Sequence, residues 1–283
     1  MGMKRMIYRI AKLLNHNSFI GIESGAKQEC LIMGKGIAFG KKIGQTIEVP
    51  QDARIYSLKE LTDRGDAREI INSVSPICLE LANEILREAE AEFGEIDRSI
   101  LFPIADHLDF AIRRLQRGEQ ISNPLTEDIR ILFYKEYKVA GCIAPMLKEK
   151  FQIELDEHET GYIALHVHSA IVDEKVSQAM EIARTVRECI SLVEKETGNS
   201  IDVMSLAYNR LMNHVRYMVA RTIHGEKLKM NLNDYMSVKF PEAFNASERI
   251  CREMEKRLGL PMPDIEIGYL AMHLERMLDS ETE

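Results

Sequence analysis

The chain has 283 residues, of which 45% are hydrophobic and 29% are charged, and this composition favours a globular protein of two or three domains. No apolar run approaches the roughly 20 residues that a membrane span needs, and no signal-type segment follows the charged start, so we expect a cytoplasmic protein without membrane insertion. Five scattered cysteines without a CxxC spacing exclude a disulfide framework and leave buried free thiols.

The formal net charge of −8 is unevenly distributed along the chain. Residues 1–60 contain ten Lys and Arg against five Asp and Glu, a net charge of +5, so the rest of the chain carries −13. A small basic unit on a large acidic body predicts that one end of the protein meets a polyanion and the other does not.

Short strands are expected before residue 59, because apolar runs alternate there with turn residues. A break at Gly34-Lys35-Gly36 is followed by Ile37-Ala38-Phe39, and the charged linker 59–65 is not expected to form a strand. A unit of roughly 55 residues is marginal alone, so we expect it to dimerise through a sheet. The expected strands are 7–14, 19–23, 29–33, 46–49 and 53–58.

From about Leu61 the apolar positions follow the period of helices, and Leu, Ala and Glu dominate. The architecture is therefore a small β unit followed by two all-helical bundles, with domains at 1–60, 66–171 and 172–283. The expected helical stretches are 67–93, 96–117, 126–150, 157–171, 173–197, 202–223, 231–258 and 264–279.

The helical part repeats itself with a step of 107 residues. Gly161-Tyr162-Ile163-Ala164-Leu165-His166 returns as Gly268-Tyr269-Leu270-Ala271-Met272-His273. A second pair of histidines keeps the same step, since His214 lies 107 residues after His107. Two copies of one domain are the simplest explanation of four histidines in one register.

Each copy thus holds two histidines, and several interpretations of them are open. His166 shares a helical face with Ile163, Val167 and Ala170, so it borders a core and could be a structural histidine bonded to a backbone carbonyl. An imidazole has an unperturbed pKa near about 6.5, so its neutral ring nitrogen can also accept a phosphoryl group or a metal ion. A phosphoryl group would add about −1.5 to −2 charges to an already acidic body.

Metal binding is the rival interpretation. Asp106-His107 and His166-Val167-His168 could supply ligands in the first copy. The second copy offers Asn213-His214 and His273-Leu274-Glu275 instead, and metal sites tolerate such an exchange of ligands poorly. We therefore expect no bound metal and no cofactor.

Over essentially its whole length the chain resembles the bacterial transcriptional antiterminators of sugar operons. The resemblance rests on Ile10-Ala11-Lys12-Leu13-Leu14-Asn15-His16-Asn17, on the segment 33–39 with Lys41-Lys42, and on the four registered histidines. Ser122-Asn123-Pro124 and the segment 164–170 look closest to the glucose-permease branch. The family implies a small all-β RNA-binding barrel, which dimerises, followed by two all-α helical-bundle domains that the sugar phosphotransferase system regulates.

The resemblance implies that the first domain binds a hairpin in a leader mRNA and so prevents an overlapping terminator from forming. Such contact suits an irregular hairpin with exposed bases: amides can meet base edges, glycines let the backbone approach, and lysines meet phosphate. Phe39 would stack on a base unless it belongs to the barrel core. Lys35 stands where many members have arginine, so the planar guanidinium that forms two parallel hydrogen bonds is absent there. The implied RNA-binding residues are Lys12, Asn15, Asn17, Gly34, Lys35, Gly36 and Phe39.

The same resemblance implies that all four registered histidines are candidates for phosphorylation. His107 and His166 would take phosphate from the sugar permease when no sugar passes, which blocks antitermination. His214 and His273 would take phosphate from the phosphocarrier HPr, which promotes activity. Charge added at a domain dimer interface would shift a packing equilibrium that the RNA-binding domain senses.

Two functions of other classes stay open on the sequence alone. One is a helical metal-dependent phosphohydrolase with a small nucleic-acid-binding appendage, which bound metal or a phosphatase activity lost in His107→Ala would favour. The other is a DNA-binding regulator, which needs a helix-turn-helix pattern that residues 1–60 do not show. A binding and switching protein that is not an enzyme remains the main interpretation.

Overall fold

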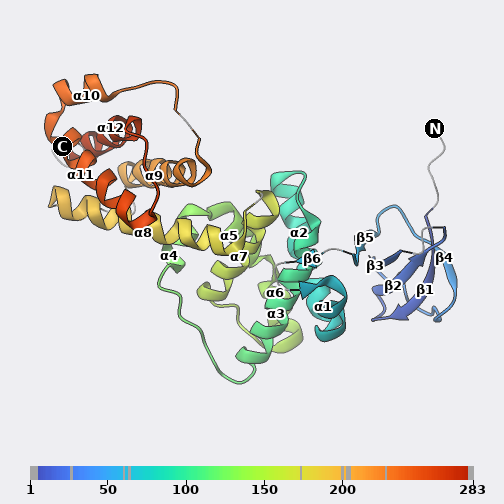
Figure 1. Cartoon of the computed structure of the whole chain (residues 1–283). Coiled ribbons are helices and arrows are strands. Elements are labelled where there is room, and N and C mark those ends of the chain that lie inside the picture. Colours follow the sequence, from blue (N-terminus) through green and yellow to red (C-terminus); the bar gives the residue numbers. More distant parts are fainter. Residues whose placement is uncertain are drawn as a thin grey trace. The chain divides into compact units, whose positions relative to one another are not determined.

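A computed structural model of the chain (Figure 1) describes residues 6–25, 28–59, 61–62, 65–172, 174–198, 201, 205–226 and 228–279. The chain forms two compact units, Met1–Asn123 with Lys135–Glu174, and Pro124–Tyr134 with Lys175–Glu283. Strands come first along the chain and helices follow. The expected order of a small β unit followed by helical domains is confirmed.

The first unit begins with a five-stranded antiparallel sheet in the order β4-β1-β2-β3-β5. Each strand begins and ends within one residue of its expected bounds. A register shift between Ile10 and Lys12 in β1 changes the alternation, so that Ile10 is buried and Lys12 is exposed. The strands are β1 Ile7–Leu13, β2 Ser18–Glu23, β3 Glu29–Met33, β4 Thr46–Glu48 and β5 Arg54–Ser57.

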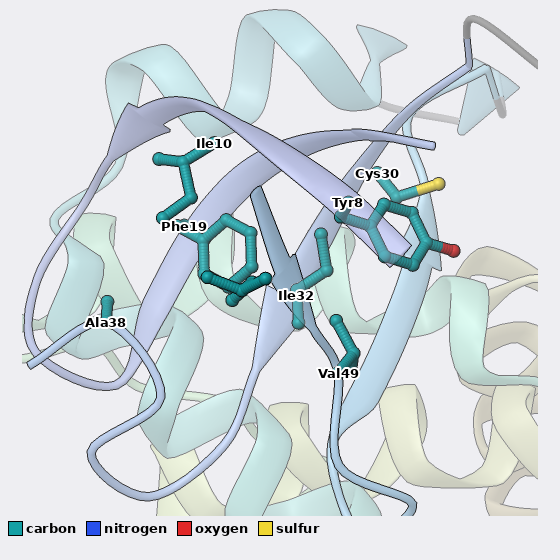
Figure 2. Packing of buried hydrophobic residues seen from close by; sticks show 8 residues of the cluster. Tyr8, Ile10, Phe19, Cys30, Ile32, Ala38 and Val49 are labelled. Atoms are coloured by element: carbon teal, nitrogen blue, oxygen red, sulfur yellow. The ribbon is translucent and has the colours of Figure 1, made fainter. Parts of the chain in front are cut away.

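Apolar side chains fill one side of this sheet, as Figure 2 shows. Gly21 in β2 makes close packing possible, because a Cβ atom built there would lie 2.7 Å from Cδ1 of Ile32 and 2.9 Å from Cε2 of Phe19. The buried cluster consists of Tyr8, Ile10, Phe19, Cys30, Ile32, Ala38, Ile47 and Val49.

Residues 35–40 form consecutive turns. Gly36 and Gly40 take φ angles of 66° and 68°, which side chains other than glycine rarely adopt. The amide of Phe39 donates to the carbonyl of Gly36 at 3.0 Å, and this turn directs the Phe39 side chain outward, where it is 69% exposed.

The expectation for the linker was wrong in one respect. β6 (Leu61–Thr62) and β7 (Gly65–Asp66) pair in a two-stranded antiparallel sheet, while Glu60, Asp63 and Arg64 lie outside the described residues. Backbone hydrogen bonds hold so short a pair of strands, so its side chains need not alternate between apolar and polar. Because that alternation is the sequence signal of a strand, this pair was not predicted.

The helices of the first unit surround the candidate histidines of the first copy. α3 lies against α2 and α7. The expected helix 67–93 is two helices, because Pro76 holds the preceding residues in extended backbone and starts a new helix. The elements are α1 Ala67–Ser73, α2 Pro76–Phe93, η1 Arg98–Ile100, α3 Leu101–Leu115, α5 Tyr134–Ala140, η2 Gly141–Ile143, α6 Ala144–Phe151 and α7 Glu157–Ile171.

The second unit contains the second copy together with α4 from the first. α9 and α11 both pack on α12, and α4 packs on α8 and α9. By the 107-residue step, α9 is the equivalent of α3, and α12 is the equivalent of α7. The elements are α4 Thr126–Leu132, α8 Val176–Thr197, α9 Leu206–His224, α10 Asn233–Lys239, α11 Pro241–Leu258 and α12 Ile265–Asp279.

The two copies differ between α5 and α6. In the second copy the matching stretch is the single helix α11, whereas the first copy is broken there by the 3-10 segment η2. Pro145, which lacks a backbone N–H, stands at the start of α6 and explains the break. None of the helices that the structure describes is long and apolar enough to cross a membrane.

Candidate functional site

The two histidines of the first copy, 59 residues apart in sequence, come together in the structure. His107 on α3 and His166 on α7 have ring centroids 5.4 Å apart, and Tyr162 lies 6.0 Å from His107. Both histidines are buried, with exposures of 8% and 4%. His166 was expected at the border of a core, and the structure places it in a buried part of α7, where Ile163 is also buried.

The second copy reproduces this arrangement with tighter stacking. His214 on α9 and His273 on α12 have ring centroids 4.5 Å apart and planes at 25°. Tyr269 is stacked on His214 at 6.2 Å and 9°. Both copies therefore place two imidazoles and a tyrosine in one cluster.

Partial burial lowers the pKa of both histidines of the second copy and so favours their neutral form. Desolvation, with smaller contributions from His273 and Arg221, lowers the pKa of His214 to about 3. Desolvation, with smaller contributions from Arg276 and Arg210, also lowers the pKa of His273. No side chain in the described part of the chain hydrogen-bonds the buried Nε2 atom of His214. A neutral imidazole keeps a lone pair on one ring nitrogen, which can take up a proton, a metal ion or a phosphoryl group.

A buried ion pair accompanies each histidine cluster, and the sequence reasoning missed it. Arg114 pairs with Glu159, whose side chain is 0% exposed and whose Oε2 lies 3.3 Å from Nε2 of His107. Arg221 donates two hydrogen bonds of 2.8 Å to Glu266. Both pairs keep the 107-residue step, so the register of the duplication could have found them.

A cavity opens beside the first cluster. Its volume is about 390 Å³. At the rim, Phe110 is 62% exposed, and the guanidinium of Arg114 lies 5.4 Å from its ring centroid. The cavity is lined by Asp106, His107, Phe110, Arg114, Ile121 and Tyr162.

His168, which the metal interpretation used, is bound by carboxylates. Its Nδ1 lies 2.9 Å from Glu136 and its Nε2 lies 3.6 Å from Glu174. Nδ1 of His158 accepts a hydrogen bond of 3.4 Å from the amide of Asn123. Among the described residues, no group of three or more His, Cys, Asp or Glu side chains is placed to hold a metal ion.

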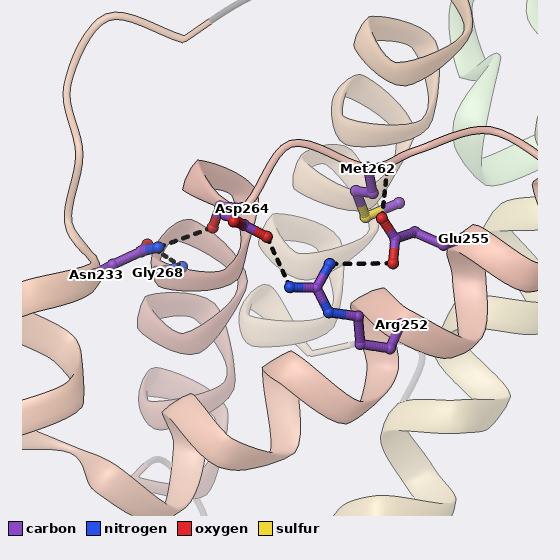
Figure 3. A network of polar contacts seen from close by, with 6 residues as sticks. All are labelled: Asn233, Arg252, Glu255, Met262, Asp264 and Gly268. Atoms are coloured by element: carbon purple, nitrogen blue, oxygen red, sulfur yellow. Dashed lines mark hydrogen bonds and ion pairs between the residues drawn. The ribbon is translucent and has the colours of Figure 1, made fainter.

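Polar contacts fix the start of α12, the helix that carries His273 (Figure 3). The amide of Gly268 donates to Oδ1 of Asn233 at 3.0 Å, and Nδ2 of Asn233 donates to the carbonyl of Asp264 at 2.9 Å. Arg252 on α11 bonds the Asp264 carboxylate at 2.7 Å. A Cβ built on Gly268 would lie 2.6 Å from Oδ1 of Asn233, which explains the glycine in the second copy of the motif.

In the loop between β1 and β2, the predicted RNA-binding amides of Asn15 and Asn17 stabilise their own loop. Oδ1 of Asn15 accepts from the amide of Asn17 at 2.8 Å and from the Ser18 hydroxyl at 2.9 Å. Oδ1 of Asn17 accepts from the amide of Gly36 at 2.8 Å, and its carbonyl accepts from Gly34 at 2.9 Å. The asparagines and the glycine turn are thus brought side by side, with only the NH₂ groups of the amides left to act as donors.

Those NH₂ groups both donate to one carboxylate of the first helical copy. Nδ2 of Asn15 lies 2.8 Å and Nδ2 of Asn17 lies 2.9 Å from Oε1 of Glu80 on α2. Lys12, a third predicted RNA-binding residue, donates to Oδ1 of Asn72 on α1 at 2.8 Å. Within the first unit, three predicted RNA contacts are therefore occupied by protein groups.

The remaining predicted contacts, Gly34, Lys35, Gly36 and Phe39, lie in the turn segment that follows β3. Lys35 and Gly36 are exposed. The ring of His16 meets Phe39 edge-on at 5.3 Å. Because Phe39 is 69% exposed, it is not a residue of the sheet core.

Comparison with known families matches the chain twice to the PRD domain, over residues 70–170 and 187–277. Residues 8–64 match the CAT RNA binding domain. The PRD matches span more than half of the chain and contain all four registered histidines. The CAT match contains every predicted RNA-binding residue.

Curated relatives are similar over nearly the whole length. "Transcription antiterminator LicT" of Bacillus subtilis is 27% identical over 274 residues, which cover 95% of this chain and 99% of the relative. "Protein GlcT" of Staphylococcus haemolyticus is 26% identical, with 94% and 95% covered. The "Beta-glucoside operon antiterminator" of Dickeya chrysanthemi is 26% identical, with 95% and 96% covered.

A solved structure resembles part of the chain. The crystal structure of GlcT CAT-PRDI superposes with a TM-score of 0.50 at 28% sequence identity. The match covers 59% of this chain and 99% of that structure.

Proposed function

The chain belongs to the PRD domain family and combines two PRD domains with a CAT RNA binding domain, and we propose how its sites carry out antitermination. It is an RNA-binding transcription antiterminator, regulated by phosphorylation from the sugar phosphotransferase system. The observation that carries the proposal is the pairing of two histidines in each PRD copy.

The CAT domain holds a hairpin of a leader mRNA and prevents an overlapping terminator from forming. The surface around Asn15, Asn17 and the turn at Gly36 supports this, because amide donors, close backbone and the exposed ring of Phe39 lie together. Lysines add phosphate contacts. The RNA-binding residues of the proposal are Lys12, Asn15, Asn17, Gly34, Lys35, Gly36 and Phe39.

The CAT sheet closes as a small barrel in a homodimer, and each PRD copy is a helical bundle. A sheet of five short strands supports dimerisation, because a unit of roughly 60 residues buries a small fraction of its surface alone. The domains of the proposal are 1–60, 66–171 and 172–283.

The four registered histidines are the phosphorylation sites. The sugar permease phosphorylates His107 and His166 when no sugar passes, and the phosphocarrier HPr phosphorylates His214 and His273. A ring nitrogen forms the new P–N bond with its lone pair, and the donor's bond to phosphorus breaks with its electron pair returning to the donor. A proton passes from the acceptor ring to the donor through solvent. The neutral state of His214 supports this chemistry.

Two of the relatives named above carry the name antiterminator, which favours the antiterminator over the phosphohydrolase. Transcription takes place in the bacterial cytoplasm, and we place the protein there.

Sequencing of RNA that co-purifies with the full chain tests the proposal. We expect leader hairpins of sugar-uptake operons, and we expect their enrichment to be lost when Asn17→Ala and Phe39→Ala are combined. Recovery of no specific RNA, or unchanged recovery with the double variant, would count against the assigned surface.

A further inference from the structure

Each histidine cluster lies beside an arginine–glutamate pair at fixed positions of the repeat. The arginine follows the first histidine of the copy by seven residues, and the glutamate precedes the second histidine by seven. Residues seven apart lie on one face of a helix, so the four groups of a copy share the contact between two helices. The pairs are Arg114 with Glu159 and Arg221 with Glu266.

Burial of these charges gives little net stability, because the desolvation of both ions offsets their attraction. Nevertheless Glu159 is 0% and Glu266 1% exposed, while Arg114 and Arg221 are 12% and 17% exposed. In the first copy the Glu159 carboxylate contacts both Arg114 and Nε2 of His107. The ion pair is therefore in direct contact with a candidate phosphorylation site.

A phosphoryl group on His107 would make the phosphate a better partner for Arg114 than the Glu159 carboxylate is. It brings about −1.5 to −2 charges and three acceptor oxygens, which the adjacent Glu159 repels. A guanidinium binds phosphate oxygens through two parallel hydrogen bonds. His107 and Arg114 line the same cavity of about 390 Å³. Since one water occupies about 30 Å³, that cavity has room for a phosphoryl group and several waters.

We propose that Arg114 and Arg221 are phosphate-binding residues, which leave their glutamates when the neighbouring histidine is phosphorylated. The inference rests on the proposed function, which supplies the phosphoryl group. Bound to arginine, the phosphoryl oxygens are shielded and hydrolysis is slowed. Once the arginine binds the phosphate, its ion pair with the glutamate is broken. The pair then no longer links α7 to α3 in the first copy, or α12 to α9 in the second. Phosphorylation thereby changes how the helices of a copy are held together.

Four variants of the full chain test this in the first copy. Arg114→Gln removes the proposed phosphate ligand, Glu159→Gln removes its competitor, and the combined variant removes both without leaving a buried charge unpaired. Arg113→Gln is the matched control, because Arg113 is on the same helix, 60% exposed and paired with Asp109. Each is incubated with phosphoenolpyruvate, enzyme I, HPr and the permease domain, and phosphate on each histidine is followed by mass spectrometry.

We expect Arg114→Gln to shorten the phosphate lifetime at His107 about tenfold, the order of one charge-assisted hydrogen bond, and Arg113→Gln to leave it unchanged. Glu159→Gln should lengthen the lifetime, and the combined variant should resemble Arg114→Gln. If the pair were only a structural bridge, both single changes would shorten the lifetime and the combined variant would restore it, which would overturn the proposal. Absence of phosphate from every histidine of the unaltered chain would instead refute the proposed function.

Discussion

The side-chain amide of Asn15 donates a 2.8 Å hydrogen bond to the carboxylate of Glu80, 65 residues further along the chain. Asn17 donates to the same oxygen at 2.9 Å. A carboxylate oxygen presents to these amides the kind of acceptor that a base edge or a phosphate would present. RNA that uses both amides must therefore displace Glu80 from them.

Glu80→Gln should strengthen binding of the leader hairpin by the full chain. The substitution keeps the shape of the side chain but weakens two charge-assisted hydrogen bonds, so we expect an affinity increase of roughly fivefold to tenfold. Electrophoretic mobility shift titration measures it. Glu84→Gln is the control, because Glu84 is on the same helix and pairs with Arg87. Equal affinities for the two variants would show that Glu80 does not compete with RNA.

Phe39→Ala should weaken RNA binding without destabilising the protein. The ring is 69% exposed, so its removal leaves no cavity in the core, while the loss of one base stack costs about 1–3 kcal/mol of binding free energy. Ile43→Ala removes a comparably exposed side chain, at 67%, from the same domain. A hairpin affinity that falls equally in both variants would remove the stacking role of Phe39.

His214 should make the protein less stable as the pH falls. Its folded-state pKa of about 3 lies below the unfolded value near about 6.5, so the unfolded state binds more protons at acid pH. The stability that neutral His214 contributes is present above about pH 6.5 and is lost as the pH falls towards about 3, by up to about 1.4 kcal/mol per pH unit. Urea unfolding at pH 7, 6 and 5 should show a shallower decline for His214→Gln than for the exposed-site control His224→Gln. If the free energy of unfolding falls equally with pH in both variants, the lowered pKa of His214 would be contradicted.

Gly268→Ala should destabilise the second unit. The new Cβ would meet Oδ1 of Asn233 at 2.6 Å and its backbone nitrogen at 2.9 Å, and overpacking of this kind costs about 1–3 kcal/mol of the free energy of unfolding. Gly141→Ala is the control, because no heavy atom lies within 4 Å of a Cβ built there. Thermal denaturation of both variants measures the difference, and an unchanged melting temperature for Gly268→Ala would show that α10 can move away at little cost.

Much of the fold was predictable where local signals are strong. α7 follows its expected bounds 157–171, because Asp156 caps its first turn by accepting from the amide of Glu159 at 2.8 Å. The strands of the sheet were equally well marked by turn residues. The break before Pro76 was missed, although proline disfavours a helix at the preceding residue, because the apolar period continues across it.

The candidate site was predictable only in part. The 107-residue step identified the histidines, and the same step also relates Arg114 to Arg221 and Glu159 to Glu266. These isolated charged residues lie outside the repeated Gly–Tyr–His motif, so the motif did not point to them. The contact of Asn15 with Glu80 leaves no periodic or spacing signal, since it joins polar residues of two domains. Such contacts follow from tertiary packing and not from local sequence.

The hairpin affinity of the full chain, measured before and after incubation with phosphoenolpyruvate, enzyme I, HPr and the permease domain, tests the central claim most directly. The account predicts that phosphorylation changes the affinity of the unaltered chain, and that neither phosphate nor an affinity change is found when His107, His166, His214 and His273 are all replaced by alanine. Two results would contradict the account. One is an unaltered chain whose hairpin affinity is the same with and without phosphate, and the other is uptake of phosphate by the variant that lacks all four histidines.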